Sequence, residues 1–258
     1  MNAKNFADRL RAREQLIGYW VVLDAPIATE RIARIGYDYV ALDGQHGLLG
    51  YQGLLSGLMA VDAGASLGTG AVGMVRVEAN DPTPIGRALD AGAAGVIVPL
   101  VDTAADAARA VAAARYPGAG TRSYGPMRSG LRIGPVPGEA DAATVVLAMI
   151  ETPQGLANVA DICATPGLDG IYVGPSDLCL AVGGRYPNDP EVAEEFGNAL
   201  ELIAKTAAAA GVAAGIHTPD GNTANLRLSQ GYTFATVASD LTHLEAIATS
   251  HLQAARSS

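Results

Sequence analysis

The sequence predicts an α/β fold, the (β/α)8 TIM barrel, from three observations. Eight apolar runs alternate with helical stretches along 258 residues, and eight such units in about 250 residues are typical of this barrel. The runs are continuously apolar, as expected for parallel strands that are buried on both faces. No low-complexity linker or second core interrupts the chain, so residues 1–258 are expected to form one domain. A doubly wound sheet is the alternative, but it has no obvious place for the last two units.

The expected strands are the apolar runs. They span residues 17–23, 38–42, 71–77, 95–100, 145–150, 170–173, 212–216 and 232–237. A polar helix is expected first, over about residues 5–15. Prolines favour helix starts in several later segments, because their missing N–H costs nothing in a first turn. These helices are expected near residues 26–34, 51–63, 82–91, 103–115, 153–166, 191–210, 219–229 and 240–255.

The segment 116–143 breaks the alternation of strands and helices. It is rich in glycine and proline and carries Arg122, Arg128 and Arg132. A loop of this length inside a compact domain is usually functional. We therefore expect a long functional loop before the fifth strand.

The composition argues against several kinds of partner and location. The formal net charge is −9 without a basic cluster, which argues against binding to nucleic acid or anionic membranes. No apolar run is long enough for a membrane span, and the N-terminus lacks an apolar signal core, so a cytoplasmic location is expected. Cys163 and Cys179 fit no metal-binding or disulfide framework.

Several catalytic templates are also missing from the sequence. No glycine-rich nucleotide motif follows the first strand, and no GxSxG pattern stands between a strand and a helix, as a nucleophile elbow would. The only lysines are Lys4 and Lys205, and neither lies at a strand end. Because a Schiff-base mechanism needs a buried lysine, any carbon–carbon bond chemistry is expected to depend on a metal.

Two carboxylates follow successive strands. Glu151 ends the fifth strand, and Asp177 follows the sixth. The carboxyl ends of parallel strands lie on one face, where active sites of such barrels occur. Two hard oxygen ligands at this edge suit an octahedral ion such as Mg²⁺ or Mn²⁺. The alternative is that Glu151 is a favourable acid at a helix N-terminus and Asp177 a turn residue.

Other polar residues at strand ends extend this candidate site. Arg76 interrupts an apolar strand, where a charge needs a partner; that partner is either a structural carboxylate or a small acid. His46 follows Asp43 by three residues, so the carboxylate can orient the imidazole and make it more basic. His217 and Ser239 end the seventh and eighth strands, and a substrate contact of His217 remains open.

The motifs around these residues resemble the HpcH/HpaI aldolase family over about residues 20–240. They are DGQHG (43–47), MVRV (74–77), LDAGAAGVIVP (89–99), RYPGAGTRS (115–123), MIETPQG (149–155) and DGIYVGPSDL (169–178). The resemblance implies a class II, metal-dependent pyruvate aldolase. Such a lyase cleaves a 4-hydroxy-2-oxo acid, typically 4-hydroxy-2-oxoheptanedioate or a 2-keto-3-deoxy sugar acid, to pyruvate and an aldehyde.

The resemblance also implies a role for each matching residue. Glu151 and Asp177 would hold a divalent cation, which would be Mg²⁺, Mn²⁺ or Co²⁺. His46, supported by Asp43, would be the base. Arg76 would bind the carbonyl oxygen of pyruvate and stabilise the enolate.

Further implications concern the carboxylate of the substrate and the assembly. The backbone of Gly174, Pro175 and Ser176 would bind the pyruvate carboxylate together with Asp177, and Asp90 would approach the site of a neighbouring subunit. The family commonly forms hexamers, as trimers of dimers, with the last helix exchanged between partners. A homo-oligomer with an exchanged C-terminal helix is therefore expected.

One residue departs from the family pattern. Gln45 stands where the family loop D-x-E-H has a glutamate, which makes the site less anionic and would alter metal affinity or the basicity of His46. His217, Ser239 and Gln45 are candidates for the aldehyde side of the site. The identity of the aldehyde stays open.

Two other functions are compatible with the same sequence. One is an acyl-CoA lyase of the citrate lyase beta-subunit or malyl-CoA type, although such enzymes usually need more chain after the eighth unit. The other is a non-catalytic barrel that binds a 2-oxo acid, with Gln45 as the mark of lost turnover. Retention of Asp43, His46 and Arg76 argues against the second.

Overall fold

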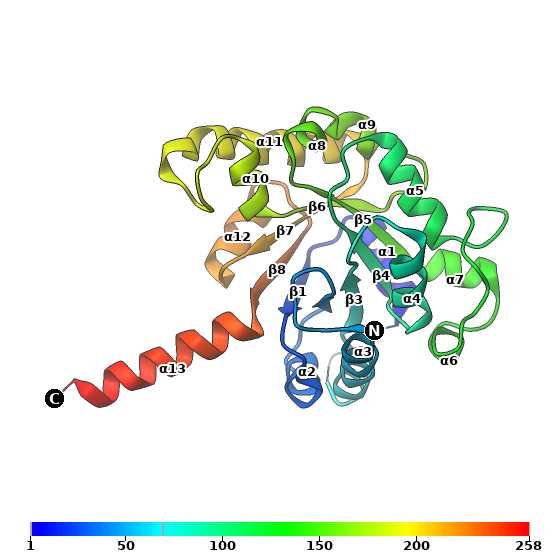
Figure 1. The fold of residues 1–258 in the computed structure, drawn as a ribbon, viewed down its shortest axis with the longest axis horizontal. Coiled ribbons are helices and arrows are strands. Elements are labelled where there is room, and N and C mark those ends of the chain that lie inside the picture. The colour runs from blue at the N-terminus through cyan, green and yellow to red at the C-terminus, as the bar shows by residue number, and fades with distance from the viewer. Residues whose placement is uncertain (1, 69, 258) are drawn as a thin grey trace.

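The computed structural model describes residues 2–68 and 70–257 and shows a closed barrel of eight parallel strands (Figure 1). Each strand pairs with the next in the chain, and β8 pairs with β1. The strands are β1 (Leu16–Val21), β2 (Tyr39–Asp43), β3 (Val72–Arg76), β4 (Gly95–Val98), β5 (Val145–Ile150), β6 (Gly170–Val173), β7 (Ala213–Thr218) and β8 (Phe234–Ser239). The predicted (β/α)8 barrel is confirmed, with strand ends that shift by at most two residues.

Helices surround the barrel and connect its strands (Figure 1). They are α1 (Ala3–Arg11), α2 (Pro26–Ala33), α3 (Tyr51–Ser66), α4 (Pro82–Asp90), α5 (Ala104–Ala114), α6 (Ser129–Arg132), α7 (Pro137–Ala143), α8 (Pro153–Ala157), α9 (Val159–Cys163), α10 (Pro175–Ala181), α11 (Ala193–Ala210), α12 (Gly221–Ser229) and α13 (Asp240–Arg256), with the 3-10 turn η1 (Pro190–Val192) before α11.

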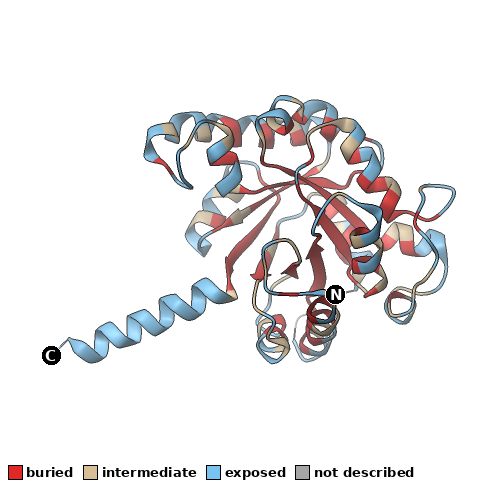
Figure 2. Ribbon diagram, viewed as in Figure 1, coloured by how far each residue is buried: buried red, intermediate tan, exposed pale blue. Residues whose placement is uncertain are grey.

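The strands are buried on both faces and separate two apolar cores (Figure 2). The outer core lies between the strands and the helices and consists largely of Val, Leu, Ile and Ala. The inner core fills the barrel and contains its large aromatic side chains, among them Tyr39, Tyr172 and Phe234. Burial on both faces explains why the strands are continuously apolar in the sequence.

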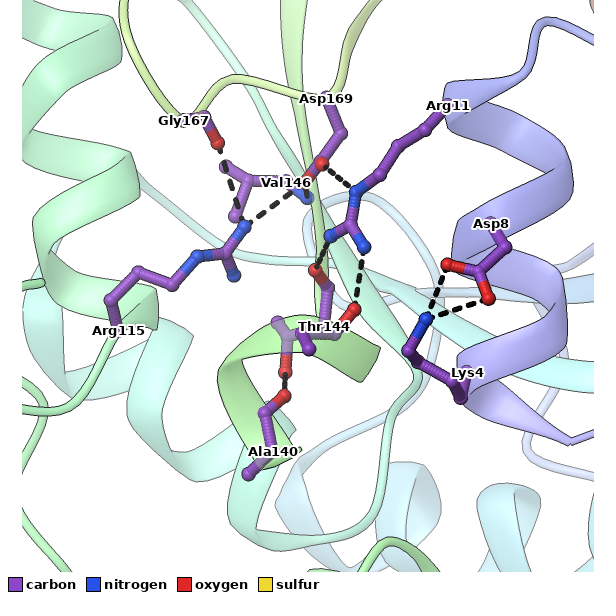
Figure 3. Close-up of polar contacts among 10 residues, drawn as sticks. Lys4, Asp8, Arg11, Arg115, Ala140, Thr144, Val146, Gly167 and Asp169 are labelled. Carbon is purple, nitrogen blue, oxygen red and sulfur yellow. Dashed lines mark hydrogen bonds and ion pairs between the residues drawn. The ribbon is translucent and has the colours of Figure 1, made fainter. Parts of the chain in front are cut away.

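Helix α1 closes the barrel at the amino ends of the strands. Phe6 and Leu10 of this helix are buried in the inner core, and the Phe6 ring lies 5.8 Å from that of Tyr39. Arg11 donates from Nε to Asp169 at 2.7 Å, and its other two nitrogens bind the carbonyl oxygens of Ala142 and Thr144 (Figure 3). The amino-end floor, defined here as α1 with Arg11, Arg115 and Asp169, is therefore closed by the protein itself.

Three segments differ from the sequence prediction. The expected loop 116–143 contains the short helices α6 and α7. The helix expected over 153–166 is divided into α8 and α9 at Asn158, whose backbone leaves helical geometry at φ −98° and ψ 9°. The turn expected around Asp177 is instead the first turn of α10. These differences involve short helices, and a helix of one or two turns gives little periodic signal in the sequence.

The last helix, α13, extends away from the barrel and buries none of its residues (Figures 1 and 2). Its first turn is fixed, because Asp240 accepts the backbone N–H groups of Val22 and Leu23. Large apolar side chains are exposed along it, including Leu244 and Ile247 at 60% each. No helix in the described ranges is long and apolar enough to cross a membrane.

Candidate active site at the barrel mouth

The alternation of side chains along each strand places a polar layer at the carboxyl ends. Leu16 and Trp20 of β1 lie inside the barrel, and side chains two apart on a strand share a face. The same alternation places Asp43 of β2, Arg76 of β3 and His217 of β7 on the inside of the barrel, near the carboxyl end of each strand. The barrel therefore ends in charged and aromatic groups above an apolar interior.

Arg76 is bound to Asp43, the residue beside it in the register of β2 and β3. The guanidinium donates from Nε to Oδ1 at 2.8 Å and from Nη2 to Oδ2 at 2.5 Å. Trp20 donates from Nε1 to the same carboxylate at 3.3 Å, and its ring lies 5.0 Å from Cζ of Arg76. The partner of Arg76 is thus the carboxylate of Asp43, which is one of the two alternatives from the sequence. The pair lies at the mouth of the barrel.

Asp43 supports the backbone of the His46 loop. Its Oδ1 accepts the backbone N–H groups of Gln45 and His46 at 3.0 and 3.2 Å. Burial alone would raise the pKa of the Asp43 carboxyl, but the hydrogen bonds and charge of Arg76, with these two amides, lower it below its usual value. The expected contact between this carboxylate and the imidazole of His46 is absent from the described residues, because Arg76, Trp20 and the loop amides bind its oxygens.

Glu151 is buried directly after β5, with 3% of its surface exposed. Its Oε1 accepts the backbone N–H of Leu100 at 2.9 Å. Leu100 has φ +54°, a left-handed conformation that is uncommon for a side chain of this size. Burial and the nearby charge of Asp177 raise the pKa of the Glu151 carboxyl, although the Leu100 amide and Arg76 oppose the shift. The site therefore holds a desolvated carboxyl beside a second one.

The loop after β4 holds the position of Glu151. Thr152 donates from Oγ1 to the carboxylate of Asp102, and Asn158 donates from Nδ2 to the carbonyl of Asp102 at 2.8 Å. Thr152 and Asn158, which follow Glu151 in the chain, are thus bound to the same loop that contains Leu100. The carboxylate is therefore positioned by backbone and side-chain contacts from one neighbouring loop.

Asp177 lies in the first turn of α10 and is exposed. Gly174 precedes the helix, Pro175 begins it, and the first turn leaves the N–H groups of Ser176 and Asp177 without intrahelical partners. A side chain at Gly174 would begin 2.5 Å from Oε2 of Glu151, so only glycine leaves this oxygen free. Glu151 and Asp177 thus lie on either side of a glycine.

A cavity of about 190 Å³ opens at the barrel mouth. Its lining residues are Trp20, His46, Arg76, Met149, Tyr172, Gly174, Pro175, Ser176, Asp177 and His217. Glu151 does not line the cavity and lies behind Gly174. The structure therefore brings together seven of the residues predicted from the sequence, namely His46, Arg76, Gly174, Pro175, Ser176, Asp177 and His217.

The donor set fits a hard divalent cation. Within the described residues no cluster of three or more His, Cys, Asp or Glu side chains is placed to hold a metal. Mg²⁺ and related ions are often held by only one or two carboxylates, with water and substrate oxygens completing the octahedron. Oε2 of Glu151 is left open by Gly174, and Asp177 is exposed at the cavity, so the two carboxylates suit this pattern.

Three predicted residues have other positions or contacts. Ser239 is the N-cap of α13, where it accepts the N–H of Thr242 in a capping box. Asp90 lies at the end of α4, on the side of the amino-end floor, and its carboxylate binds Arg122 at 2.6 Å. Neither lines the cavity of its own chain, nor does Gln45. Their expected roles at the aldehyde or in a neighbouring subunit remain predictions.

Three aromatic or apolar residues of the site were missed by the sequence analysis, namely Trp20, Met149 and Tyr172. The Trp20 ring stacks on Tyr172, with ring centroids 5.8 Å apart and an angle of 21°. The signal was present, since Trp20 is the single tryptophan of the chain and lies near the carboxyl end of an aliphatic strand. Reading each strand with a period of two would have placed it in the same layer as Arg76.

The fold and the polar layer define a (β/α)8-barrel protein with a carboxylate-rich site at its mouth. The profile of the HpcH/HpaI aldolase/citrate lyase family matches residues 16–246, and the chain belongs to this family. This confirms the resemblance seen in the sequence motifs. It also confirms the expected class, an enzyme of the pyruvate aldolase type.

Named relatives agree with this membership. The chain is 39% identical to a hydroxypyruvate/pyruvate aldolase of Rhizorhabdus wittichii over 89% of each chain. It is 37% identical to a 5-keto-4-deoxy-D-glucarate aldolase of Salmonella paratyphi C, over 92% of this chain and 90% of that one. A crystal structure of an HpcH/HpaI aldolase/citrate lyase family protein from Burkholderia cenocepacia superimposes with a TM-score of 0.88 at 31% identity, covering 98% and 100% of the two chains.

Proposed function

We propose that this protein is a divalent-metal-dependent lyase that reversibly cleaves a 4-hydroxy-2-oxo acid to pyruvate and an aldehyde. The observation that carries the proposal is the joint position of Arg76, His46 and Asp177 on one cavity, with the buried Glu151 behind Gly174. Relatives that are named as aldolases match about nine-tenths of the chain. The family name also includes citrate lyase, which keeps the acyl-CoA lyase as the alternative.

Glu151 and Asp177 would hold the divalent cation, Mg²⁺, Mn²⁺ or Co²⁺. When bound, this ion acts as a Lewis acid that lowers the free energy of the pyruvate enolate. Arg76 contributes the second positive charge of the site, and its guanidinium is held by Asp43 in a fixed orientation. A preorganised cation next to a developing oxyanion is a large source of rate acceleration.

The remaining steps are carried by the residues of the cavity. His46 removes the proton of the 4-hydroxyl group, the C3–C4 bond breaks, and its electron pair passes to the enolate as the aldehyde forms. Arg76 stabilises the negative charge on the enolate oxygen, and protonation at C3 then gives pyruvate. The N–H groups at the start of α10, beside Gly174, Pro175 and Ser176, would bind the carboxylate of the 2-oxo acid.

The test is deuterium exchange into the methyl group of pyruvate, followed by NMR in the presence of Mg²⁺ or Mn²⁺ and again with a chelator. This exchange needs only the enolate half of the reaction, so the aldehyde need not be known. We expect exchange that depends on the metal and is lost in His46→Gln. Tight metal-dependent pyruvate binding without exchange would instead favour the non-catalytic barrel, and turnover of an acyl-CoA substrate would favour the acyl-CoA lyase.

We further propose a homo-oligomer in which α13 packs on a partner subunit, in line with a hexamer built as a trimer of dimers. The exposed apolar side chains of α13 and its lack of contacts beyond its first turns support this assembly. Analytical ultracentrifugation of the full chain and of Leu244→Asp/Ile247→Asp tests it, since the variant should dissociate. The cytoplasmic location also remains a proposal.

A further inference from the structure

A chain of three buried hydroxyl groups crosses the interior of the barrel. Tyr172 donates to Oγ1 of Thr236 at 2.6 Å, and the hydroxyl of Tyr39 lies 2.7 Å from the same oxygen. All three residues are at most 2% exposed. Burying a hydroxyl group without a hydrogen-bond partner costs free energy, so the two tyrosines depend on this one threonine inside the barrel.

The strand register explains how the two tyrosines reach the same threonine. Thr236 of β8 and Tyr39 of β2 are both paired with Gly18 of β1, which lies between them. A Cβ at Gly18 would overlap the ring of Tyr39, so glycine is the residue that lets this ring cross β1. On the other side, Tyr172 of β6 is paired with Gly215 of β7 and reaches Thr236 on the next strand.

Tyr172 connects these hydroxyl groups to the candidate active site. Its side chain lines the cavity, and its ring stacks on that of Trp20. Trp20 in turn donates its indole N–H to Asp43 and lies with its ring 5.0 Å from Cζ of Arg76. The contacts therefore run from the buried hydroxyl groups through two aromatic rings to the charged pair at the mouth.

The tyrosine hydroxyls are kept protonated. Burial raises the pKa of Tyr39 and of Tyr172 above the ordinary value, although the hydrogen bond to Thr236 opposes the shift. Both groups can therefore donate hydrogen bonds at neutral pH. A hydrogen bond at the end of the ring fixes the tilt of Tyr172, whereas a phenylalanine at this position would be restrained by packing alone.

We infer that Thr236 and Tyr172 are positioning residues that hold the Trp20 ring in place. This ring, together with Asp43, keeps the guanidinium of Arg76 in its orientation at the wall of the cavity. The consequence for catalysis rests on the proposed function, in which Arg76 stabilises the enolate. Thr236 acts only through other residues, since it does not line the cavity.

The experiment uses Trp20 as its own reporter, because it is the single tryptophan of the chain. Its fluorescence and the quenching of that fluorescence by acrylamide need neither metal nor substrate. Thr236→Val removes the hydroxyl at nearly constant shape, and Thr236→Ser keeps it. Thr144→Val is the matched control, because Thr144 is also buried and donates its hydroxyl to the carbonyl of Ala140 at 2.8 Å. Metal-dependent exchange of the pyruvate methyl protons is then measured per folded molecule.

We expect Thr236→Val to raise the quenching constant of Trp20 by about twofold, because two buried hydroxyls lose their partner and the rings loosen. Its kcat for exchange should fall by about tenfold with a smaller change in KM for pyruvate, as for a cation that is misplaced but still present. Thr236→Ser and Thr144→Val should stay close to the wild type in both measurements. Tyr172→Phe, which removes only the bond to Thr236, should repeat both changes and replaces Thr236→Val if that variant does not fold.

Unchanged quenching in folded Thr236→Val and Tyr172→Phe overturns the inference. So does altered quenching with an exchange rate equal to that of the wild type, or the same changes in Thr144→Val, which would indicate a general loosening of the fold. Absence of exchange in the wild-type enzyme would contradict the proposed function. The quenching comparison would still decide whether the hydroxyl groups position Trp20, so the two failures are distinguishable.

Discussion

The two ends of the barrel each contain a buried arginine–aspartate pair, but they use it differently. At the amino-end floor, Asp169 binds Arg11 and Arg115 and also accepts the N–H of Val146 at 2.8 Å (Figure 3). At the mouth, Asp43 binds Arg76, and the pair faces a cavity of about 190 Å³. The floor pair therefore joins segments of the fold, whereas the mouth pair holds the Arg76 guanidinium at the wall of the cavity.

The difference shows what makes a buried charge pair functional. Burying ions is costly, and a well-satisfied pair inside a fold often adds little net stability. At the floor every oxygen of Asp169 is bound by protein groups, and α1 covers the pair. At the mouth, open groups such as His217 and Asp177 stand beside the pair, so a substrate can complete the network.

The largest effect is expected from the carboxylates at the mouth. Glu151→Gln and Asp177→Asn should each lower metal-dependent deuterium exchange into pyruvate by about a thousandfold or more, because each removes one of the two charged groups proposed to hold the cation. Exchange by NMR and Mn²⁺ affinity by electron paramagnetic resonance measure this. Glu78→Gln, an exposed carboxyl just beyond β3, is the matched control. An exchange rate equal to that of the wild type in either site variant would contradict the proposed metal site.

Arg76→Lys comes next, with exchange expected to fall by about a hundredfold. Lysine keeps the charge but cannot make the two parallel hydrogen bonds to Asp43, so the cation would lose its fixed orientation. Circular dichroism establishes that the variant is folded before its exchange rate is compared. A folded Arg76→Lys or Arg76→Ala enzyme with full turnover would show that the mouth pair is structural, like that of the floor.

Asp169→Asn tests the amino-end floor, where we expect a loss of stability and little change in activity. Removing one partner of a buried pair should lower the free energy of unfolding by about 3 kcal/mol, because two arginines lose their counter-charge. Exchange per folded molecule should remain near that of the wild type. Urea unfolding and the exchange assay on the same sample measure both quantities. A strong loss of exchange without loss of stability would contradict the separation of the two ends.

A smaller effect is expected from the titration of His217. Its pKa is lowered to about 4 in the folded protein, so the unfolded chain binds more protons between that pH and its ordinary value. Stability should therefore fall as the pH is lowered, by about 2 kcal/mol from this group between pH 7.5 and pH 5. Urea unfolding at both pH values should show that His217→Gln loses less stability than the wild type. Equal losses would mean that His217 is hydrated and charged.

The smallest effect is expected at Leu100. Its left-handed backbone, with φ +54°, costs a residue with a Cβ about 1 kcal/mol, which glycine avoids while keeping the N–H that binds Glu151. Glycine also makes the unfolded chain more flexible, which offsets part of the gain. Leu100→Gly should thus change the free energy of unfolding by less than about 1 kcal/mol. A larger loss would show that the Leu100 side chain contributes to the mouth.

The sequence by itself determined the architecture and much of the polar layer. Eight continuously apolar runs require burial on both faces, and this requirement led to the barrel. Because the carboxyl ends of parallel strands share one face, the positions of His46, Arg76, Asp177 and His217 at a common mouth followed from order along the chain alone. The same rule placed Glu151 near them without any knowledge of contacts.

Only the tertiary structure decided which of these groups bind one another. The register of β2 and β3 sets Asp43 beside Arg76, so the carboxylate pairs with the guanidinium and not with the His46 imidazole. The position of α13 makes Ser239 a helix cap, and burial next to Arg76 keeps His217 neutral. Partners and protonation depend on distances between separate strands, and a linear pattern of residue types carries no information about those distances.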